Sequence, residues 1–224
     1  MTALLGQADD LLRGHPPESG DDRARSAGLL QLVAFVAIFG AFYGAVMGTF
    51  GGVRGERALQ LLYSGLKVPL LLLVTFALSL PSFFVLNTLL GVRADFARAL
   101  RALVATQAVL TIVLASLAPF TAVWYASLDA YRPAILFNAA MFAVASFAAQ
   151  GLLRRWYAPL IARNIRHRML LRVWIIIYAF VGVQMAWVLR PFVGDPTKPT
   201  RFFREGAWGN AYVEVARMIV EVVR

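Results

Sequence analysis

The sequence predicts an all-α fold: a polytopic membrane bundle of about five transmembrane helices, followed by a C-terminal amphipathic helix. Hydrophobic residues make up 60% of the 224 residues and charged residues only 15%, whereas soluble domains carry about 25% charged residues. The apolar residues gather into five long blocks, and the charged residues lie between them. Each block is close to or above the roughly 17–25 residues that a helix needs to cross a bilayer.

Composition also limits the chemistry that the chain can perform. It has no cysteine and only two histidines, so disulfides, thiolate nucleophiles and cysteine metal sites are excluded. The net charge of +10 is carried almost wholly by arginine, a usage typical of GC-rich bacterial genomes. Because the arginines lie at the ends of apolar blocks without a nucleic-acid motif, they indicate anionic lipid headgroups as partners and argue against nucleic acid.

Three regions are predicted along the chain. They are a polar cytoplasmic N-terminal arm (1–25), a five-helix transmembrane domain (26–190), and an extracytoplasmic aromatic loop with an amphipathic helix (191–224). Leucines in the arm are spaced for one face of a short helix, which the break at Gly14 would end. The first apolar block begins near residue 27 and is too long for a signal-peptide core, so we expect a flexible arm and no cleaved leader.

The first span, about residues 27–53, carries glycines at every fourth position, namely Gly40, Gly44 and Gly48. Such a row removes the side chains from one helix face, so that a second helix can approach closely. The face is therefore a candidate for helix packing or for contact in an oligomer. Packing against a helix of the same chain is the reading we favour, and a homo-oligomer is the alternative.

The second span, about residues 68–92, has Pro69 near its start, where a first helical turn tolerates proline. Pro81 lies in mid-span and predicts a kink. Polar residues near this kink and in the next span are candidates to line a polar path; together with Pro81 they are Ser79, Ser82, Asn87 and Gln107. The alternative is that these groups make hydrogen bonds between helices.

The third and fourth spans, about residues 102–119 and 134–153, are followed by the most basic part of the chain. Residues 154–172 contain six arginines and no acidic residue, and Pro159 divides them. This composition predicts an interfacial helix lying on an anionic membrane surface. Its candidate contacts with lipid headgroups or a partner are Arg154, Arg155, Arg163, Arg166 and Arg168.

The fifth span, residues 173–189, ends at Arg190-Pro191-Phe192 and leads into an aromatic tail. Arg190, Phe202, Phe203 and Trp208 are further candidate contacts with lipid headgroups or a partner. Residues 211–224 place opposite charges three and four residues apart, which predicts an amphipathic surface helix. Polar and aromatic groups converge in residues 190–210, so we expect any recognition of a partner or ligand there.

The distribution of positive charge predicts the orientation. With the N-terminus inside, the inner segments of a five-span chain carry twelve arginines and the outer loops four basic residues. The positive-inside rule therefore favours a cytoplasmic N-terminus and an outer C-terminus, in a bacterial cytoplasmic (inner) membrane. The six basic residues of the tail, which would lie outside, reduce the excess of positive charge on the inner side without reversing it.

Catalytic and metal-binding motifs are missing from the sequence. It holds no zinc-protease, serine-hydrolase or phosphate-loop motif, so we expect no catalytic residue, metal site or cofactor. The interiors of the expected spans contain no ionisable residue, which argues against an ion-coupled pump. A lipid-modifying enzyme would have to use Asp195 or Glu205.

Five spans, a polar arm and a second span written Lys67-Val68-Pro69 through Leu80-Pro81 resemble the Yip1 family of small polytopic membrane proteins. The resemblance implies membrane organisation and trafficking partners without catalysis, and it assigns no functional residue. We therefore expect a non-catalytic scaffold or partner-binding subunit of the bilayer. An oligomeric channel or permease subunit, with a path along the second span, is the alternative.

Overall fold

The computed structural model describes residues 2–14, 22–128, 130–204 and 207–213. Within these ranges, every element of regular secondary structure is a helix and there is no β-strand. This confirms the predicted all-α class. The elements in chain order are α1 (Thr2–Leu12), α2 (Asp22–Gly48), the 3-10 turn η1 (Gly55–Arg57), α3 (Ala58–Leu89), the 3-10 turn η2 (Arg93–Asp95), α4 (Phe96–Ser127), α5 (Tyr131–Arg163) and α6 (Arg166–Leu189).

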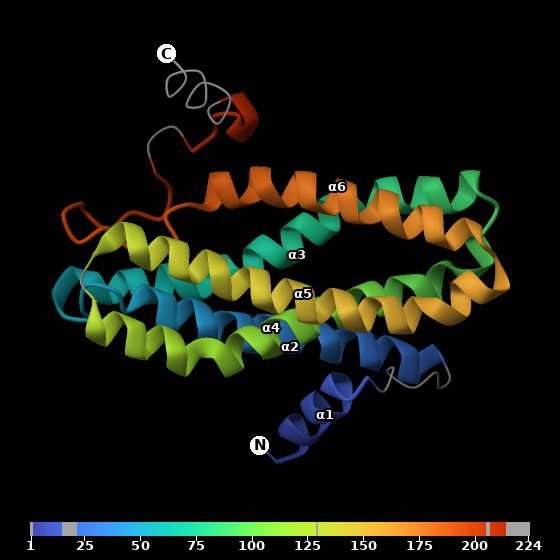
Figure 1. The fold of residues 1–224 in the computed structure, drawn as a ribbon, viewed down its shortest axis with the longest axis horizontal. Helices are drawn as coiled ribbons and strands as arrows, with labels where there is room; N and C mark the ends of the chain where they lie inside the picture. The colour runs from blue at the N-terminus through green and yellow to red at the C-terminus, as the bar shows by residue number, and fades with distance from the viewer. Residues whose placement is uncertain (1, 15–21, 129, 205–206, 214–224) are drawn as a thin grey trace.

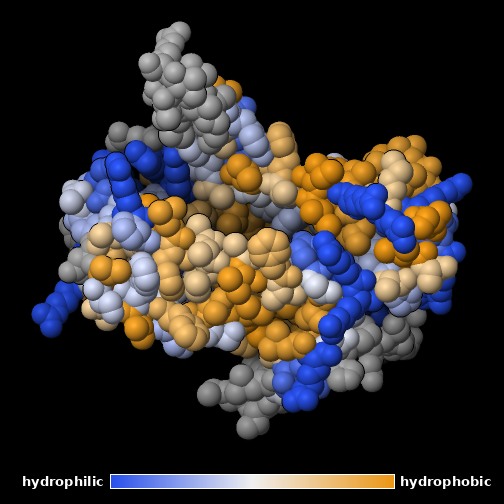
Figure 2. All heavy atoms as spheres, viewed as in Figure 1, coloured by the Kyte–Doolittle hydropathy of each residue, from blue (hydrophilic) through white to orange (hydrophobic). Residues whose placement is uncertain are grey.

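Five of these helices, α2 to α6, are long and apolar enough to cross a membrane. The chain is therefore a multi-pass helical membrane protein. Helices α3, α4 and α5 contain 32 or 33 residues, so each is about 48 Å long and extends beyond a hydrocarbon core of about 30 Å. Figure 2 shows hydrophobic residues over much of the middle of one face, with hydrophilic residues toward its two sides.

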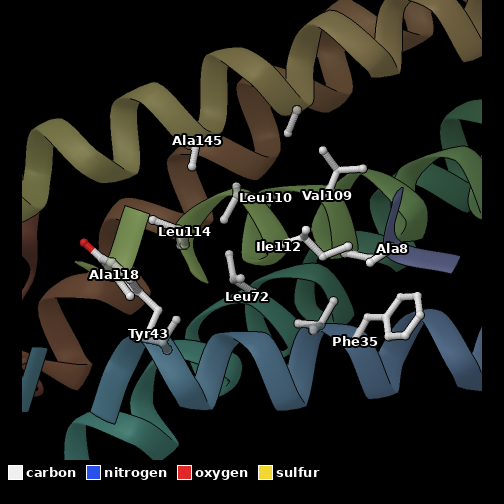
Figure 3. Packing of buried hydrophobic residues seen from close by; sticks show 14 of the residues in the cluster. Ala8, Phe35, Tyr43, Leu72, Val109, Leu110, Ile112, Leu114, Ala118 and Ala145 are labelled. Atoms are coloured by element: carbon white, nitrogen blue, oxygen red, sulfur yellow. The ribbon is translucent and has the colours of Figure 1, made fainter. Parts of the chain in front are cut away.

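Helix α4 lies at the centre of the bundle, and 67% of its most apolar window is buried, against 17% for α5 and for α6. It packs against α2 on one side and α5 on the other, while α3 packs against α2 and α6. Figure 3 shows this core, with Val109, Leu110 and Leu114 of α4 between α2 and α5.

Helices α5 and α6 are joined by a connection of residues 164–165 and pack together mainly near that end. They diverge toward the other end, where α3 passes behind them (Figure 1). Both helices expose large apolar side chains, among them Phe147 and Ile176, as expected of surfaces that face lipid.

The glycine row of α2 packs against α3 of the same chain. A Cβ atom on Gly44 would lie 2.3 Å from the backbone oxygen of Ser64, and one on Gly48 would lie 2.5 Å from the Cα atom of Leu61. At Gly40 the nearest atom, on Thr111, would be 3.4 Å away. The α2–α3 approach therefore depends on Gly44 and Gly48. Helix α2 ends at Gly48, earlier than the expected residue 53.

Helix α3 begins at Ala58, ten residues before the predicted start of the second span. Pro69 therefore lies inside the helix and not in a first turn, and Lys67 belongs to the membrane helix and not to the preceding loop. The prediction that no ionisable residue occupies a span interior is thus wrong at Lys67, whose side chain is fully buried.

The arginine-rich segment 154–172 does not form a separate interfacial helix. Helix α5 continues through Pro159 to Arg163, and α6 begins at Arg166. Apolar residues of this segment are buried among α3, α4 and α6, namely Tyr157, Leu160, Leu170 and Leu171. Packing of that apolar face therefore keeps the segment in the bundle and leaves the arginines at one end.

The N-terminal arm contains helix α1, which lies against the bundle (Figure 1). Ala8 and Leu11 are buried in the main core, and the indole nitrogen of Trp156 donates to the carbonyl of Gly14 at 3.0 Å. The expected flexible arm is thus docked over residues 2–14. The predicted amphipathic helix 211–224 lies outside the described residues from residue 214 onward.

Candidate binding cavity

A cavity of about 890 Å³ lies at the end of the bundle where the chain leaves α6. Figure 2 shows a hollow in this face with hydrophobic residues at its bottom. Residues 190–204, which we call the exit segment, form one side of the cavity. The helices supply Met47 from α2, Gln60 and Leu71 from α3, Tyr131, Ile135, Asn138, Ala139 and Phe142 from α5, and Ala186 from α6.

Side chains of α3 and α5 fix the exit segment through three successive backbone carbonyls. Lys67 Nζ donates to Pro191 O at 2.7 Å, and Ser64 Oγ donates to Phe192 O at 2.5 Å. The hydroxyl of Tyr131 donates to Val193 O at 3.3 Å. Carbonyls of a non-helical segment that are buried away from water need such partners, because leaving them unpaired is costly.

Gln60 completes this arrangement. Its side-chain nitrogen donates to Ser64 Oγ at 2.8 Å, and its methylene groups lie where a Cβ on Gly194 would come within 2.7 Å. Gly194 therefore allows the exit segment to lie directly on α3. Residues 60, 64 and 67 follow the spacing of one helix face, so this face of α3 forms a row of donors.

Lys67 is covered on its other side by an aromatic ring. Its Nζ lies 4.9 Å from the ring centroid of Phe202, and Phe202 packs edge-on against Tyr63 at 5.3 Å. In the described part of the chain no carboxylate forms an ion pair with Lys67. A carbonyl and a ring face thus take the place of a counter-ion.

The wall on the α5 side is apolar except for the Tyr131 hydroxyl and the buried amide of Asn138. Asn138 donates to the Tyr125 hydroxyl at 2.5 Å and to Ala134 O at 2.7 Å, and it accepts from the Tyr43 hydroxyl at 3.1 Å. These bonds fix the amide between α2, α4 and α5. From Tyr131 to Phe142 the wall extends about 16 Å along the helix.

The exit segment brings four cationic side chains to the cavity: Arg190, Lys198, Arg201 and Arg204. Arg190 Cζ lies 3.1 Å from the ring centroid of Trp187. The described lining contains one carboxylate, Asp195, which accepts from the Thr197 amide at 3.0 Å and lies 3.4 Å from Lys198 Nζ. These bonds, that to the Thr197 backbone foremost, hold the pKa of Asp195 below its usual value.

The chain beyond the exit segment folds back onto α6. Gln184 donates to Gly209 O at 3.1 Å and accepts from the Ala211 amide at 3.0 Å. The ring of Tyr212 stacks on Phe180 at 4.4 Å. Trp208 is 82% exposed and lies 5.9 Å from the ring of Phe203, so this aromatic pair faces outward.

The five candidates for a polar path are not brought together. Ser79 and Asn87 are buried and bond to carbonyls of their own helix, at 2.8 and 2.9 Å. Pro81 and Ser82 are exposed on another face of α3, and Gln107 accepts from the Tyr178 hydroxyl at 2.8 Å. None of the five lines the cavity.

The predicted headgroup contacts divide between the two ends of the bundle. Arg190 lines the cavity, and Phe202 and Phe203 lie beside it in the exit segment. The other arginines lie at the opposite end, where Arg166 donates to Leu90 O at 2.9 Å and Arg163 lies 3.9 Å from Asp95. The remaining arginines of that set, Arg154, Arg155 and Arg168, are exposed at the same opposite end and do not line the cavity.

Sequence reasoning missed Gln60, Ser64, Tyr131 and Asn138. The spacing of Gln60, Ser64 and Lys67 was a usable sign, since three polar residues on one face of an apolar helix indicate a buried polar contact. In the described residues, no group of three or more His, Asp or Glu side chains could hold a metal ion. No family model, curated protein or solved structure matches the chain, and the Yip1 resemblance stays a prediction.

Proposed function

We propose that this protein is a non-catalytic membrane protein that acts by binding, and that the cavity holds an amphiphilic molecule of the bilayer. The observation that carries the proposal is the cavity itself. Its volume of about 890 Å³ lies within the roughly 300–1,000 Å³ of typical small-molecule sites. The protein would then perform the scaffold or partner-binding role expected from the sequence while a lipid is bound in its cavity.

The distribution of chemistry along the cavity supports an amphiphile. Charged side chains of the exit segment lie at one end, and Leu71, Ala139 and Phe142 supply an apolar wall deeper in the bundle. Ala139 of α5 and Ala186 of α6 both line the cavity, and the two helices diverge on this side of the bundle (Figure 1). A fully polar solute would leave the apolar wall without a partner.

Two observations favour binding over the other classes. The carboxylate of Asp195 bonds to Thr197 and pairs with Lys198 within one turn. Its interactions therefore stabilise the loop, which argues against a catalytic role on a substrate. Glu205 lies outside the described residues. A channel along the second span would need Ser79, Ser82 and Asn87 on one face, but Ser82 is exposed on another face than the buried Ser79 and Asn87.

We further propose that the protein resides in a bacterial cytoplasmic membrane with its N-terminus inside. Arginines concentrate at the end that carries the α5–α6 connection, and basic ends stay in the cytoplasm. The mouth of the cavity would then face outward. Because the chain has no cysteine, a single Thr197→Cys substitution tests this: a membrane-impermeant thiol reagent should label it in intact cells, and labelling only after lysis would reverse the orientation.

Native mass spectrometry in a mild detergent tests the binding proposal. Wild-type protein should carry a co-purifying amphiphile, and Ala139→Phe should lose most of it, because the new ring occupies space inside the cavity. Ala140→Phe is the matched control, since Ala140 is exposed and does not line the cavity. Equal occupancy in the two variants, or an empty wild-type protein, would contradict the proposal.

A further inference from the structure

We infer that the polar end of the bound amphiphile carries hydroxyl groups, and that the side-chain oxygen of Gln60 accepts a hydrogen bond from one of them. This inference rests on the proposed function and names the chemical class of headgroup that the same cavity selects. Gln60 lines the cavity and is only 3% exposed, so its side chain is largely removed from bulk water. A polar group in that position needs a hydrogen-bond partner.

The nitrogen of the Gln60 amide already has its partners within the protein. It donates to Ser64 Oγ at 2.8 Å and lies 3.5 Å from Phe192 O. Within the described part of the chain, no donor bonds to the amide oxygen, Oε1. A carbonyl oxygen can accept two hydrogen bonds, and leaving a buried one unpaired is costly. The unused capacity of Gln60 is therefore that of an acceptor.

The neighbours of Gln60 determine which way its amide points. The single hydrogen of the Ser64 hydroxyl is donated to Phe192 O, so this hydroxyl can only accept from Gln60. Turning the amide round would set two acceptors against each other. Gly194 lies over the same amide, where a Cβ atom would come within 2.9 Å of Gln60 Cδ. The oxygen of Gln60 is thus held in place before a ligand binds, which favours recognition.

Asn138, the other amide of the described lining, indicates the same chemistry. Its nitrogen donates to the Tyr125 hydroxyl and to Ala134 O, which uses both of its hydrogens. Its oxygen accepts one hydrogen bond, from the Tyr43 hydroxyl, and keeps one free lone pair. Both amides that line the cavity therefore offer an oxygen, and neither offers a free N–H, so the lining favours a ligand that donates hydrogen bonds.

A hydroxyl fits this lining better than a protonated amine, the other common donor of lipid headgroups. An amine would add a positive charge to a cavity that Lys198 and Arg204 already line. A hydroxyl donates to an amide oxygen and, through its own oxygen, accepts from cationic side chains. Glycerol and sugar headgroups carry several hydroxyls on neighbouring carbons, so they can meet both kinds of partner at once.

The test uses two uncharged probes that differ in their donor hydrogens, monoolein and the dimethyl ether of monoolein. They are added in equal amounts to purified full-length protein in a mild detergent, and native mass spectrometry measures the ratio of the bound forms. Wild-type protein should bind about five times more monoolein, the ratio expected for one hydrogen bond. Because neither probe is charged, attraction of an anion to the exit segment cannot produce this ratio.

Three variants assign the preference to the oxygen of Gln60. Gln60→Met removes the acceptor and should bring the ratio close to one. Gln60→Glu keeps an oxygen acceptor but loses the donor to Ser64, so it should retain the preference. Gln107→Met is the matched control, because Gln107 is a buried amide that accepts from the Tyr178 hydroxyl at 2.8 Å and does not line the cavity. Loosening of the exit segment alone would weaken both probes equally and leave the ratio unchanged.

The remaining outcomes separate this inference from the proposed function. Equal binding of the two probes by wild-type protein, abolished by Ala139→Phe, would overturn the hydroxyl inference and leave the proposed function standing. A preference that survives in Gln60→Met, or that is lost equally in Gln107→Met or in Gln60→Glu, would overturn the role of the Gln60 oxygen. Absence of bound monoolein from protein that still carries a co-purifying amphiphile would overturn the inference alone, and absence of any amphiphile would overturn both proposals.

Discussion

At the scale of single residues, Lys67 shows how a buried cation is accommodated inside an apolar helix. Its side chain is fully buried, yet Nζ donates to Pro191 O and lies over the Phe202 ring. Hydrogen bonds from charged donors contribute about 1.5–3 kcal/mol, more than ordinary ones. The position of the exit segment should therefore depend on this single side chain more than on its neighbours.

We predict that Lys67→Met releases the exit segment. Losing the donor to Pro191 O should cost about 2 kcal/mol, which raises the open fraction of the segment about 30-fold. The measurement is the thiol-labelling rate of a Val193→Cys reporter, since Val193 is buried and the chain has no other cysteine. Leu66→Met, at an exposed position next to Lys67, is the control, and equal labelling in both variants would disprove the role of Lys67.

Some of this could have been predicted from the residues alone. Gln60, Ser64 and Lys67 lie on one face of a helix as soon as that helix begins at Ala58. Hydropathy predicts a later start for this helix, because Arg54, Glu56 and Arg57 lie just before it and Lys67 interrupts the apolar residues that follow. A prediction from hydropathy ends a span at a charged residue. In the folded chain, a backbone carbonyl of a distant segment can accept a hydrogen bond from that residue, and the helix continues.

At the scale of elements, the α2–α3 pair depends on backbone approach. Positions 44 and 48 have no room for a side chain, because backbone atoms of Ser64 and Leu61 occupy the place of a Cβ. Such contacts are typical of small-residue packing in membranes, where close approach replaces the hydrophobic drive. The glycine row thus fixes α3, and with it the donors that bind the exit segment.

Gly44→Ala should destabilise the protein by about 1–3 kcal/mol, because the new methyl group forces α2 and α3 apart. Gly28→Ala, in the same helix with open space around it, should be neutral or gain up to about 1 kcal/mol from helix propensity. Thermal unfolding in detergent measures both. Equal midpoints for the two variants would show that the α2–α3 approach does not limit stability.

The same scale explains why the arginine-rich segment 154–172 was assigned wrongly. Six arginines and Pro159 argue for an interfacial helix when only composition is considered. The structure buries Tyr157 and Leu160 against α4 and α6, so α5 extends beyond the membrane core as one helix of 33 residues. Span length predicted from apolar blocks therefore underestimates helix length wherever basic residues continue the packing face.

At the scale of the whole molecule, the sequence predicted five spans and a recognition region after residue 190, but it contained no measure of how α5 and α6 diverge. That divergence results from packing choices spread over several helices: α5 follows α4, and α6 follows α3. No local pattern encodes the space left between two helices that pack on different neighbours. The cavity is thus a property of the tertiary arrangement.

A structure determined in a lipid bilayer nanodisc would test the central claim most directly. The account predicts elongated density that begins among the cations of the exit segment and runs beside Asn138 between α5 and α6. The apolar wall should be in contact with that density and not with water. Closure of α5 onto α6, with side chains filling the 890 Å³ space, would contradict the account.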